Sequence, residues 1–323
     1  MTKEGFSTVY CLLSTVYCLL STQSMSATAN NTSGDYDLRS LNHERRMLGV
    51  YRRRAAHDAG ALQPLANACW RAASFEWALY GDAATVRRLW GEAAGALARG
   101  FAQRQPGFDP SPDQLVLALH FAIAAREREA FHTLALTAPN VREGALHGAR
   151  AFRSSRAHFH LAEGYALVAR ALVEQKPHPA RGAVAALRAA RAEADRGWWG
   201  RQFPDPLDAA WRVSEHEAVC ALLSAVARRV AGEPDDDAAA PEEADAAAAE
   251  EFARTADETL SRLENFLAHD TNHHPKLYVW LPGLALCALA ASAGFPAGWL
   301  ADRHGRDAEG YARLPPELLR RTG

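Results

Sequence analysis

The sequence lacks the alternation of apolar and polar residues that a half-buried β-strand requires, since no such pattern persists over five residues anywhere in the chain. Val, Ile, Thr and Tyr are sparse, and alanine dominates the apolar residues. Alanine loses no side-chain entropy in a helix, whereas β-branched residues lose some. These shortages exclude a β-rich protein and favour an all-α fold.

The chain also lacks the motifs that accompany common enzyme chemistry. It has no glycine-rich phosphate loop, no GxSxG elbow and no dinucleotide fingerprint. The cysteines show no CxxC or Cys/His metal spacing, and three of them lie on apolar helical faces, where buried, inert thiols in a reducing compartment are expected: Cys69, Cys220 and Cys287. We therefore expect no enzyme and no cofactor. A Cys/His dyad stays open, because its partners can be distant in sequence.

Two histidine-containing segments resemble metal sites only in part. The run Glu215, His216, Glu217 lacks the second histidine of HExxH, because position 220 is Cys220. A second group follows a predicted helix in a proline-containing loop: His269, Asp270, His273 and His274. Its spacing fits no known metal site, so a capping loop is the preferred interpretation. A metal-dependent hydrolase using His269 and His273 remains the third hypothesis for function.

No strong excess of either charge is present. The chain has 36 basic and 38 acidic residues and a net charge of -2, which gives no global attraction to nucleic acid. An apolar run without charge, between Lys276 and Asp302, is interrupted by Pro282, Gly283 and Gly294. It predicts a buried core helix from Leu281 and no membrane span. We expect a cytoplasmic protein that binds neither membrane nor nucleic acid.

The N-terminus contains the unit STVYCLL twice, in residues 7–20. A tandem repeat of the DNA heptamer TCTACTG encodes this peptide. Because seven bases are not a whole number of codons, three copies are read as seven residues before the peptide pattern recurs. Either translation starts at Met25, or the repeat is translated and its copy number switches the reading frame; the first is preferred. Residues 26–37 are polar and predict disorder. Residues 1–37 are thus expected to be a disordered or spurious extension, and 38–323 a single helical domain.

From there the chain predicts about ten helices in mostly antiparallel pairs. Gly81 ends one helix and Asp82 caps the next, while Ser111 and Pro112 begin an almost wholly apolar helix expected to be central to the core. A helix with a basic face is predicted from Leu41 to His57. Helix-turn-helix units start near Leu65, Ser111 and Ser155, about forty-five residues apart. The interpretation is a loose helical-repeat-like array.

Two segments are candidates for binding a partner. Trp198 and Trp199 are flanked by Arg196 and Arg201, a composition typical of interface hot spots if exposed, although the two tryptophans can also cap the core between helices. The low-complexity insert at about 232–250 is part of a stretch, from Glu233 to Glu251, with nine acidic residues and no basic one. One interpretation is a solvated linker whose second half can join the next helix. The other is a segment that attracts a basic partner. In that case the candidate contact residues are Asp235, Asp236, Asp237, Glu242 and Glu243.

The C-terminal segment resembles the Immunity protein 49 family of bacterial polymorphic toxin loci. The resemblance lies in an apolar helix opening with Leu281, Pro282 and Gly283, in a Leu314-Pro315 ending, and in the turn at residues 77–82. It implies an all-helical cytoplasmic protein that binds and neutralises a cognate toxin, without catalytic residues. The alternative is a helical scaffold or adaptor that binds a peptide or protein in the concave face of its array.

Overall fold

The computed structural model describes residues 33–103, 107–108, 110–137, 156–194, 203, 205–232, 241–269, 276, 278–293 and 318. Within these residues the chain forms ten α-helices, one short 3-10 helix (η1) and no strand, which confirms the predicted all-α class. The elements are α2 (Ser33–Ala55), η1 (Ala59–Ala61), α3 (Leu62–Tyr80), α4 (Ala83–Gln103), α5 (Pro112–Ala125), α6 (Arg128–Thr137), α8 (Arg156–Glu174), α9 (Pro177–Ala192), α11 (Pro206–Ala231), α12 (Pro241–His269) and α13 (Leu281–Ser292).

The helix ends follow from local side-chain chemistry, as predicted. Ser111 accepts a hydrogen bond from the backbone of Gln114, and Pro112 occupies the first turn of α5. The Asp82 carboxylate accepts from the amides of Ala84 and Thr85 at 3.0 and 3.2 Å, which satisfies donors that the first turn of α4 leaves unpaired. Gly81 ends α3 with φ of 63°, a conformation that glycine adopts without steric cost.

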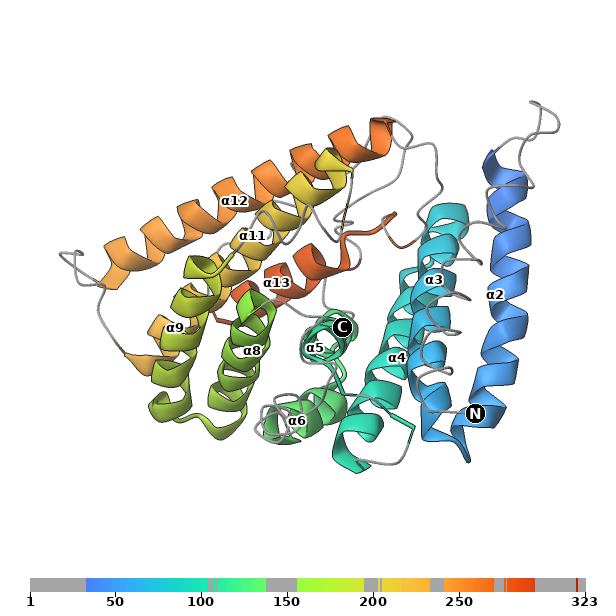
Figure 1. Cartoon of the computed structure of the whole chain (residues 1–323), viewed down its shortest axis with the longest axis horizontal. Helices are drawn as coiled ribbons and strands as arrows, with labels where there is room; N and C mark the ends of the chain where they lie inside the picture. Colours follow the sequence, from blue (N-terminus) through green and yellow to red (C-terminus); the bar gives the residue numbers. More distant parts are fainter. Residues whose placement is uncertain are drawn as a thin grey trace, which may run out of the picture.

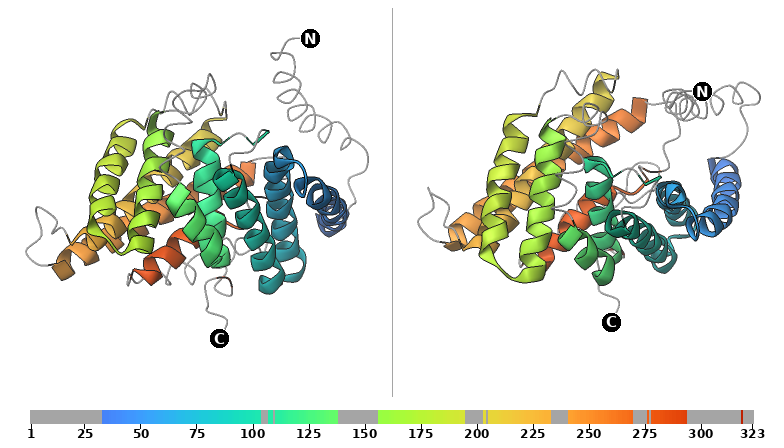
Figure 2. Two further views of the ribbon diagram at one scale, coloured as in Figure 1. Left: turned by 90° about the horizontal axis from the view of Figure 1, so that it is seen from below. Right: turned by 60° about the horizontal axis from the view of Figure 1, so that its bottom comes forward.

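The helices form an array of antiparallel neighbours (Figure 1). Helices α2, α3 and α4 lie at one end, α5 and α6 in the middle, and α8, α9, α11 and α12 at the other end, an arrangement that Figure 2 shows from two further sides. The pairs α3–α4, α8–α9 and α11–α12 each pack along their length. Short connections force this pairing, since only Gly81 and Asp82 separate α3 from α4.

Helices α5 and α8 pack in a parallel register that matches the predicted repeat. Asp113 faces His158, and His120 faces Tyr165, so the facing residues are 45 positions apart in both pairs (113 to 158 and 120 to 165). A constant offset means that the two helices run in the same direction. The spacing of about forty-five residues read from the sequence therefore corresponds to a structural repeat at this point of the array.

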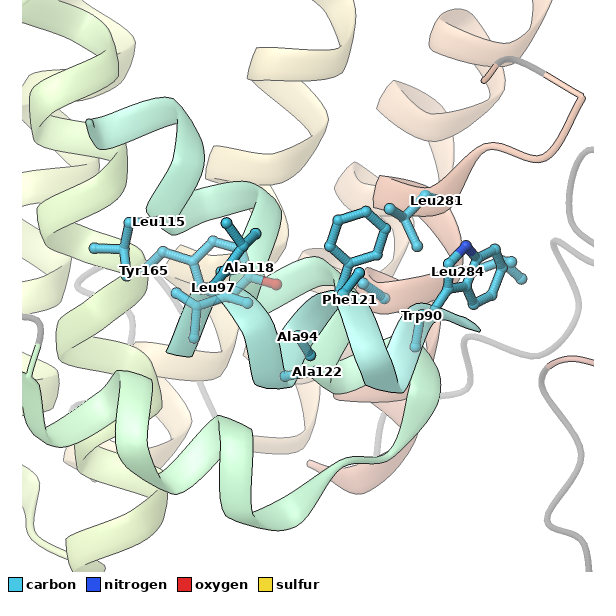
Figure 3. Packing of buried hydrophobic residues seen from close by; sticks show 14 of the residues in the cluster. Trp90, Ala94, Leu97, Leu115, Ala118, Phe121, Ala122, Tyr165, Leu281 and Leu284 are labelled. Carbon is cyan, nitrogen blue, oxygen red and sulfur yellow. The ribbon is translucent and has the colours of Figure 1, made fainter. Parts of the chain in front are cut away.

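The core is continuous across the array, with α5 and α13 at its centre. Phe121 of α5 packs among Trp90 of α4 and Leu281 and Leu284 of α13, and all four side chains are buried (Figure 3). At Gly283 a Cβ would lie 2.1 Å from Cε3 of Trp280, so only glycine permits this close approach. These contacts confirm that the segment from Leu281 is a buried core helix. In the described part of the chain, no helix combines the length and apolar character needed to span a membrane.

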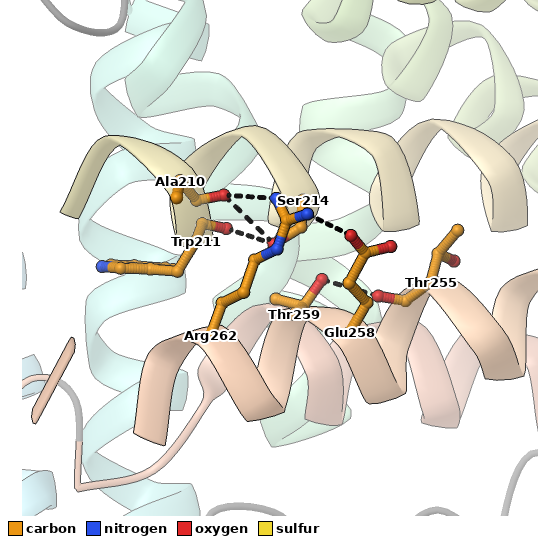
Figure 4. Close-up of polar contacts among 7 residues, drawn as sticks. All are labelled: Ala210, Trp211, Ser214, Thr255, Glu258, Thr259 and Arg262. Atoms are coloured by element: carbon orange, nitrogen blue, oxygen red, sulfur yellow. Dashed lines mark hydrogen bonds and ion pairs between the residues drawn. The ribbon is translucent and has the colours of Figure 1, made fainter. Parts of the chain in front are cut away.

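Polar contacts brace α11 against α12 (Figure 4). The Arg262 guanidinium donates to the carbonyl oxygen of Ala210 at 3.2 Å and pairs with Glu258 on its own helix. The Thr259 hydroxyl donates to the carbonyl oxygen of Thr255 at 2.8 Å, so this buried hydroxyl has a hydrogen-bond acceptor within its own helix. The brace and the buried apolar residues of both helices together hold the long α12 on α11.

One predicted boundary needs correction. Helix α2 begins at Ser33, so residues 33–37 belong to the folded domain and not to a disordered extension. The reason is a long-range contact, because Asp37 is buried and accepts a hydrogen bond of 2.9 Å from the Tyr278 hydroxyl. Helix α12 begins at Pro241, so the second half of the acidic insert joins this helix, as the sequence allowed. Residues 1–32 lie outside the described part.

Candidate functional site

The partner-binding residues predicted from the sequence fall mostly where the structure gives no placement. Trp198 and Trp199 lie outside the described residues, as do the three aspartates Asp235, Asp236 and Asp237. Glu242 and Glu243 belong to the first turn of α12, and only their place in the helix is described. Their proposed contact with a basic partner stays a prediction.

The deepest ionisable pair joins α5 to α8. The rings of His120 and Tyr165 lie 5.4 Å apart, and both side chains are fully enclosed. Burial lowers the pKa of His120 to about 3 and raises the pKa of Tyr165, because the charged form of each group loses its hydration. Within the described residues, neither Nε2 of His120 nor the Tyr165 hydroxyl has a hydrogen-bond partner. Both groups are therefore neutral at pH 7 and occupy the core.

A Cys/His pair, left open by the sequence, is present on α11. The Cys220 sulfur lies 3.6 Å from Nε2 of His216, and the same nitrogen is 3.3 Å from the carbonyl oxygen of Ala190. Burial raises the pKa of Cys220 to about 12 and lowers the pKa of His216 to about 4. A thiolate nucleophile requires the opposite shift of the cysteine pKa. At pH 7 the pair is a neutral thiol beside a neutral imidazole.

The remaining candidates for metal chemistry are not brought together. Glu215 turns toward α13 and accepts a hydrogen bond of 2.6 Å from the Trp280 indole, whereas His216 contacts Ala190. Nδ1 of His269, the last residue of α12, donates to the carbonyl oxygen of Asn265 at 2.8 Å. Asp270, His273 and His274 lie outside the described residues. Among those that are described, no group of three or more His, Cys, Asp or Glu side chains could hold a metal ion.

The outer face of α2 is the feature that sequence reasoning recognised as basic but did not assign to a site. All six arginines of α2 are exposed, whereas the two acidic residues whose side chains are described, Asp37 and Glu44, are buried. Leu38 and Val50 are exposed on the same helix. Because α2 is the last helix of the array at this end and packs mainly on α3 and η1, its opposite side faces away from the core.

Three of these arginines form ion pairs with other residues of the protein. Arg45 pairs with Glu76 at 2.7 Å, Arg52 with Glu92 at 2.6 Å and Arg54 with Asp58 at 3.1 Å. In a fourth ion pair the arginine is on the neighbouring helix: Arg71 of α3 pairs with the buried Glu44 of α2 at 2.6 Å. These bridges fix the rotation of α2 about its own axis. Arg46 and Arg53 make no ion pair with the described residues and lie on the side of α2 that faces away from its buried residues.

Comparison with known proteins yields no match, whether to protein-family models, to curated proteins or to solved structures.

Proposed function

We propose that this protein acts by binding another protein, and that its partner is a cognate toxin that it neutralises in the cytoplasm of the producing bacterium. The observation that carries the proposal is the outer face of α2. Arg46 and Arg53 are exposed there beside Val50, and the opposite side of the helix packs on α3 and η1. Arginine is enriched in protein interfaces and forms bidentate hydrogen bonds. A pre-ordered helix face also loses little conformational entropy on binding.

The toxin-neutralising part of the proposal comes from the resemblance to the Immunity protein 49 family. Leu314 and Pro315 lie outside the described residues, whereas the other residues that carry the resemblance have structural roles. Leu281 and Gly283 open the central helix α13, and Gly81 and Asp82 form the turn between α3 and α4. Residues of this kind favour a shared fold, whereas the partner is recognised by the surface. The proposed mechanism is therefore stoichiometric blocking, with no bond made or broken.

Co-expression with the toxin domain encoded beside this gene tests the proposal. Cells that carry the toxin alone should stop growing, and cells that carry both proteins should grow. The purified proteins should form a complex of fixed stoichiometry on size-exclusion chromatography. The control is an unrelated toxin, against which the chain should give no protection. Failure to rescue growth, together with no complex, would leave the scaffold or adaptor alternative as the better account.

A further inference from the structure

A ridge of exposed arginines runs along α2. Arg39, Arg46 and Arg53 are spaced by seven residues, so they recur every two helical turns on one side, about 10 Å apart. All three are exposed. The buried residues of α2, including Leu41, Glu44 and Leu48, lie on the opposite side. The ridge therefore points directly away from the core.

The centre of this ridge has no side chain of its own. Gly49 lies between Arg46 and Arg53 on the helix surface, and Nη1 of Arg53 is 3.7 Å from the position of its missing Cβ, the one side-chain atom of the described residues within 4 Å. Val50, beside it, is 37% exposed. The Arg53 guanidinium therefore lies over Gly49, where a carboxylate of a partner could reach it without meeting another side chain at this position. Apolar surface bordered by arginine matches the composition of interface cores.

We infer that this ridge is a docking surface for an acidic patch of a partner protein, and the inference rests on the proposed toxin-binding function. Charge complementarity selects the occupant, because Arg46 and Arg53 have no acidic neighbour in the described chain to neutralise them. Residues 1–32 do not supply that charge, since they contain one acidic and one basic residue, Glu4 and Lys3. An acidic partner surface would pair with both arginines and speed association.

Nucleic acid is the less suitable occupant. The chain as a whole carries a net charge of -2, which does not attract a polyphosphate. The ridge is also bordered by apolar Leu38 and Val50, and three of the six arginines of α2 already have carboxylate partners within the fold. A short ridge with apolar flanks suits a protein surface, in which carboxylates and apolar side chains alternate.

Two variants of the full chain test the docking surface, each with a matched control. Arg46→Glu with Arg53→Glu reverses the charge of the ridge, and Arg188→Glu with Arg254→Glu makes the same change at exposed arginines of α9 and α12. Gly49→Trp adds bulk between Arg46 and Arg53 without changing charge, and Gly95→Trp adds the same bulk at an exposed, open position of α4. The probes are the toxin domain encoded beside the gene and a 20-base-pair DNA duplex.

The expected result is that both ridge variants bind the toxin domain about 100-fold more weakly than the wild type, while both controls bind within about 3-fold. Thermal unfolding followed by circular dichroism checks that all four variants fold. Rising salt should slow wild-type association, and an acidic-to-arginine change in the toxin patch should restore binding to the charge-reversal variant.

Three results would overturn the inference. If the wild type binds the toxin and the ridge variants bind equally well, the docking surface is wrong and the proposed function stands. If the wild type neither binds nor protects, both fall together. If the duplex binds the wild type and the charge-reversal variant loses that binding while toxin binding is unchanged, the ridge recognises nucleic acid.

Discussion

The Tyr278 hydroxyl donates a hydrogen bond of 2.9 Å to the carboxylate of Asp37, joining the first described helix to the segment that leads into α13. Both residues are buried, and Tyr278 also packs edge-on against Phe75 of α3. The contact attaches α2, and the arginine ridge on its outer face, to the centre of the molecule.

Loss of this hydrogen bond should destabilise the protein measurably. In Tyr278→Phe the Asp37 side chain, which is 1% exposed, loses this hydrogen-bond donor in the core. We expect the free energy of unfolding to fall by about 1–3 kcal/mol. Urea denaturation followed by circular dichroism measures the change. Tyr80→Phe alters a tyrosine that is 56% exposed and should leave stability within about 0.5 kcal/mol; equal effects of the two substitutions would contradict the role of the Tyr278 contact.

Acidification should weaken the fold through its buried histidines. The folded protein holds the pKa of His120 at about 3, against about 6.5 in the unfolded chain. The unfolded state therefore takes up a proton as the pH falls below about 6.5, and the folded state does not. This stability is fully present above pH 6.5 and is lost as the pH falls toward 3. Between pH 7 and pH 5 the loss from His120 should be about 2 kcal/mol.

The variant His120→Leu isolates this effect, since it removes the titrating group while keeping an apolar side chain in the core. Urea denaturation at pH 7 and pH 5 should show that the variant loses about 2 kcal/mol less than the wild type over this interval. His57→Leu, at an exposed position, should lose as much as the wild type. An unchanged pH dependence in His120→Leu would show that other groups control acid unfolding.

The contact between Gly283 and Trp280 should tolerate no added side chain. In Gly283→Ala the new methyl group would overlap the indole ring, whose Cε3 lies 2.1 Å from the Cβ position. We expect a destabilisation of about 1–3 kcal/mol from overpacking. Gly95→Ala is the matched control, because nothing lies near its Cβ and the helix interior favours alanine by about 0.5–1 kcal/mol. The two substitutions should therefore shift the thermal midpoint in opposite directions.

The three core cysteines should be unreactive in the native protein. Cys69, Cys220 and Cys287 are buried, and burial raises the pKa of Cys220 and of Cys287 to about 12. Almost no thiolate then exists at pH 8. With Cys11 and Cys18 replaced by serine, Ellman's reagent should react at least about 100-fold more slowly before unfolding in urea than after it. Fast reaction of one native thiol would show that its site opens to solvent.

The basic helix of the candidate site could be predicted from neighbouring residues, but its ion pairs with other helices could not. The sequence already predicted a basic helix from Leu41, because charge and helical periodicity can be read from neighbouring residues. Which arginines are free depends on Glu76 and Glu92, which lie on other helices and pair with Arg45 and Arg52. The proximity of Cys220 to His216 follows from their spacing on one helix, but their neutrality follows from burial.

The sequence by itself determined the helical class and those helix ends that local capping residues set. Ser111, Gly81 and Asp82 act on backbone groups within four residues of themselves, so their effect does not depend on the rest of the fold. The tertiary structure decided that α2 begins before Leu38 and that its arginine ridge faces outward. Both depend on contacts such as Asp37 with Tyr278, whose partners are far apart in the chain and meet only when the core forms.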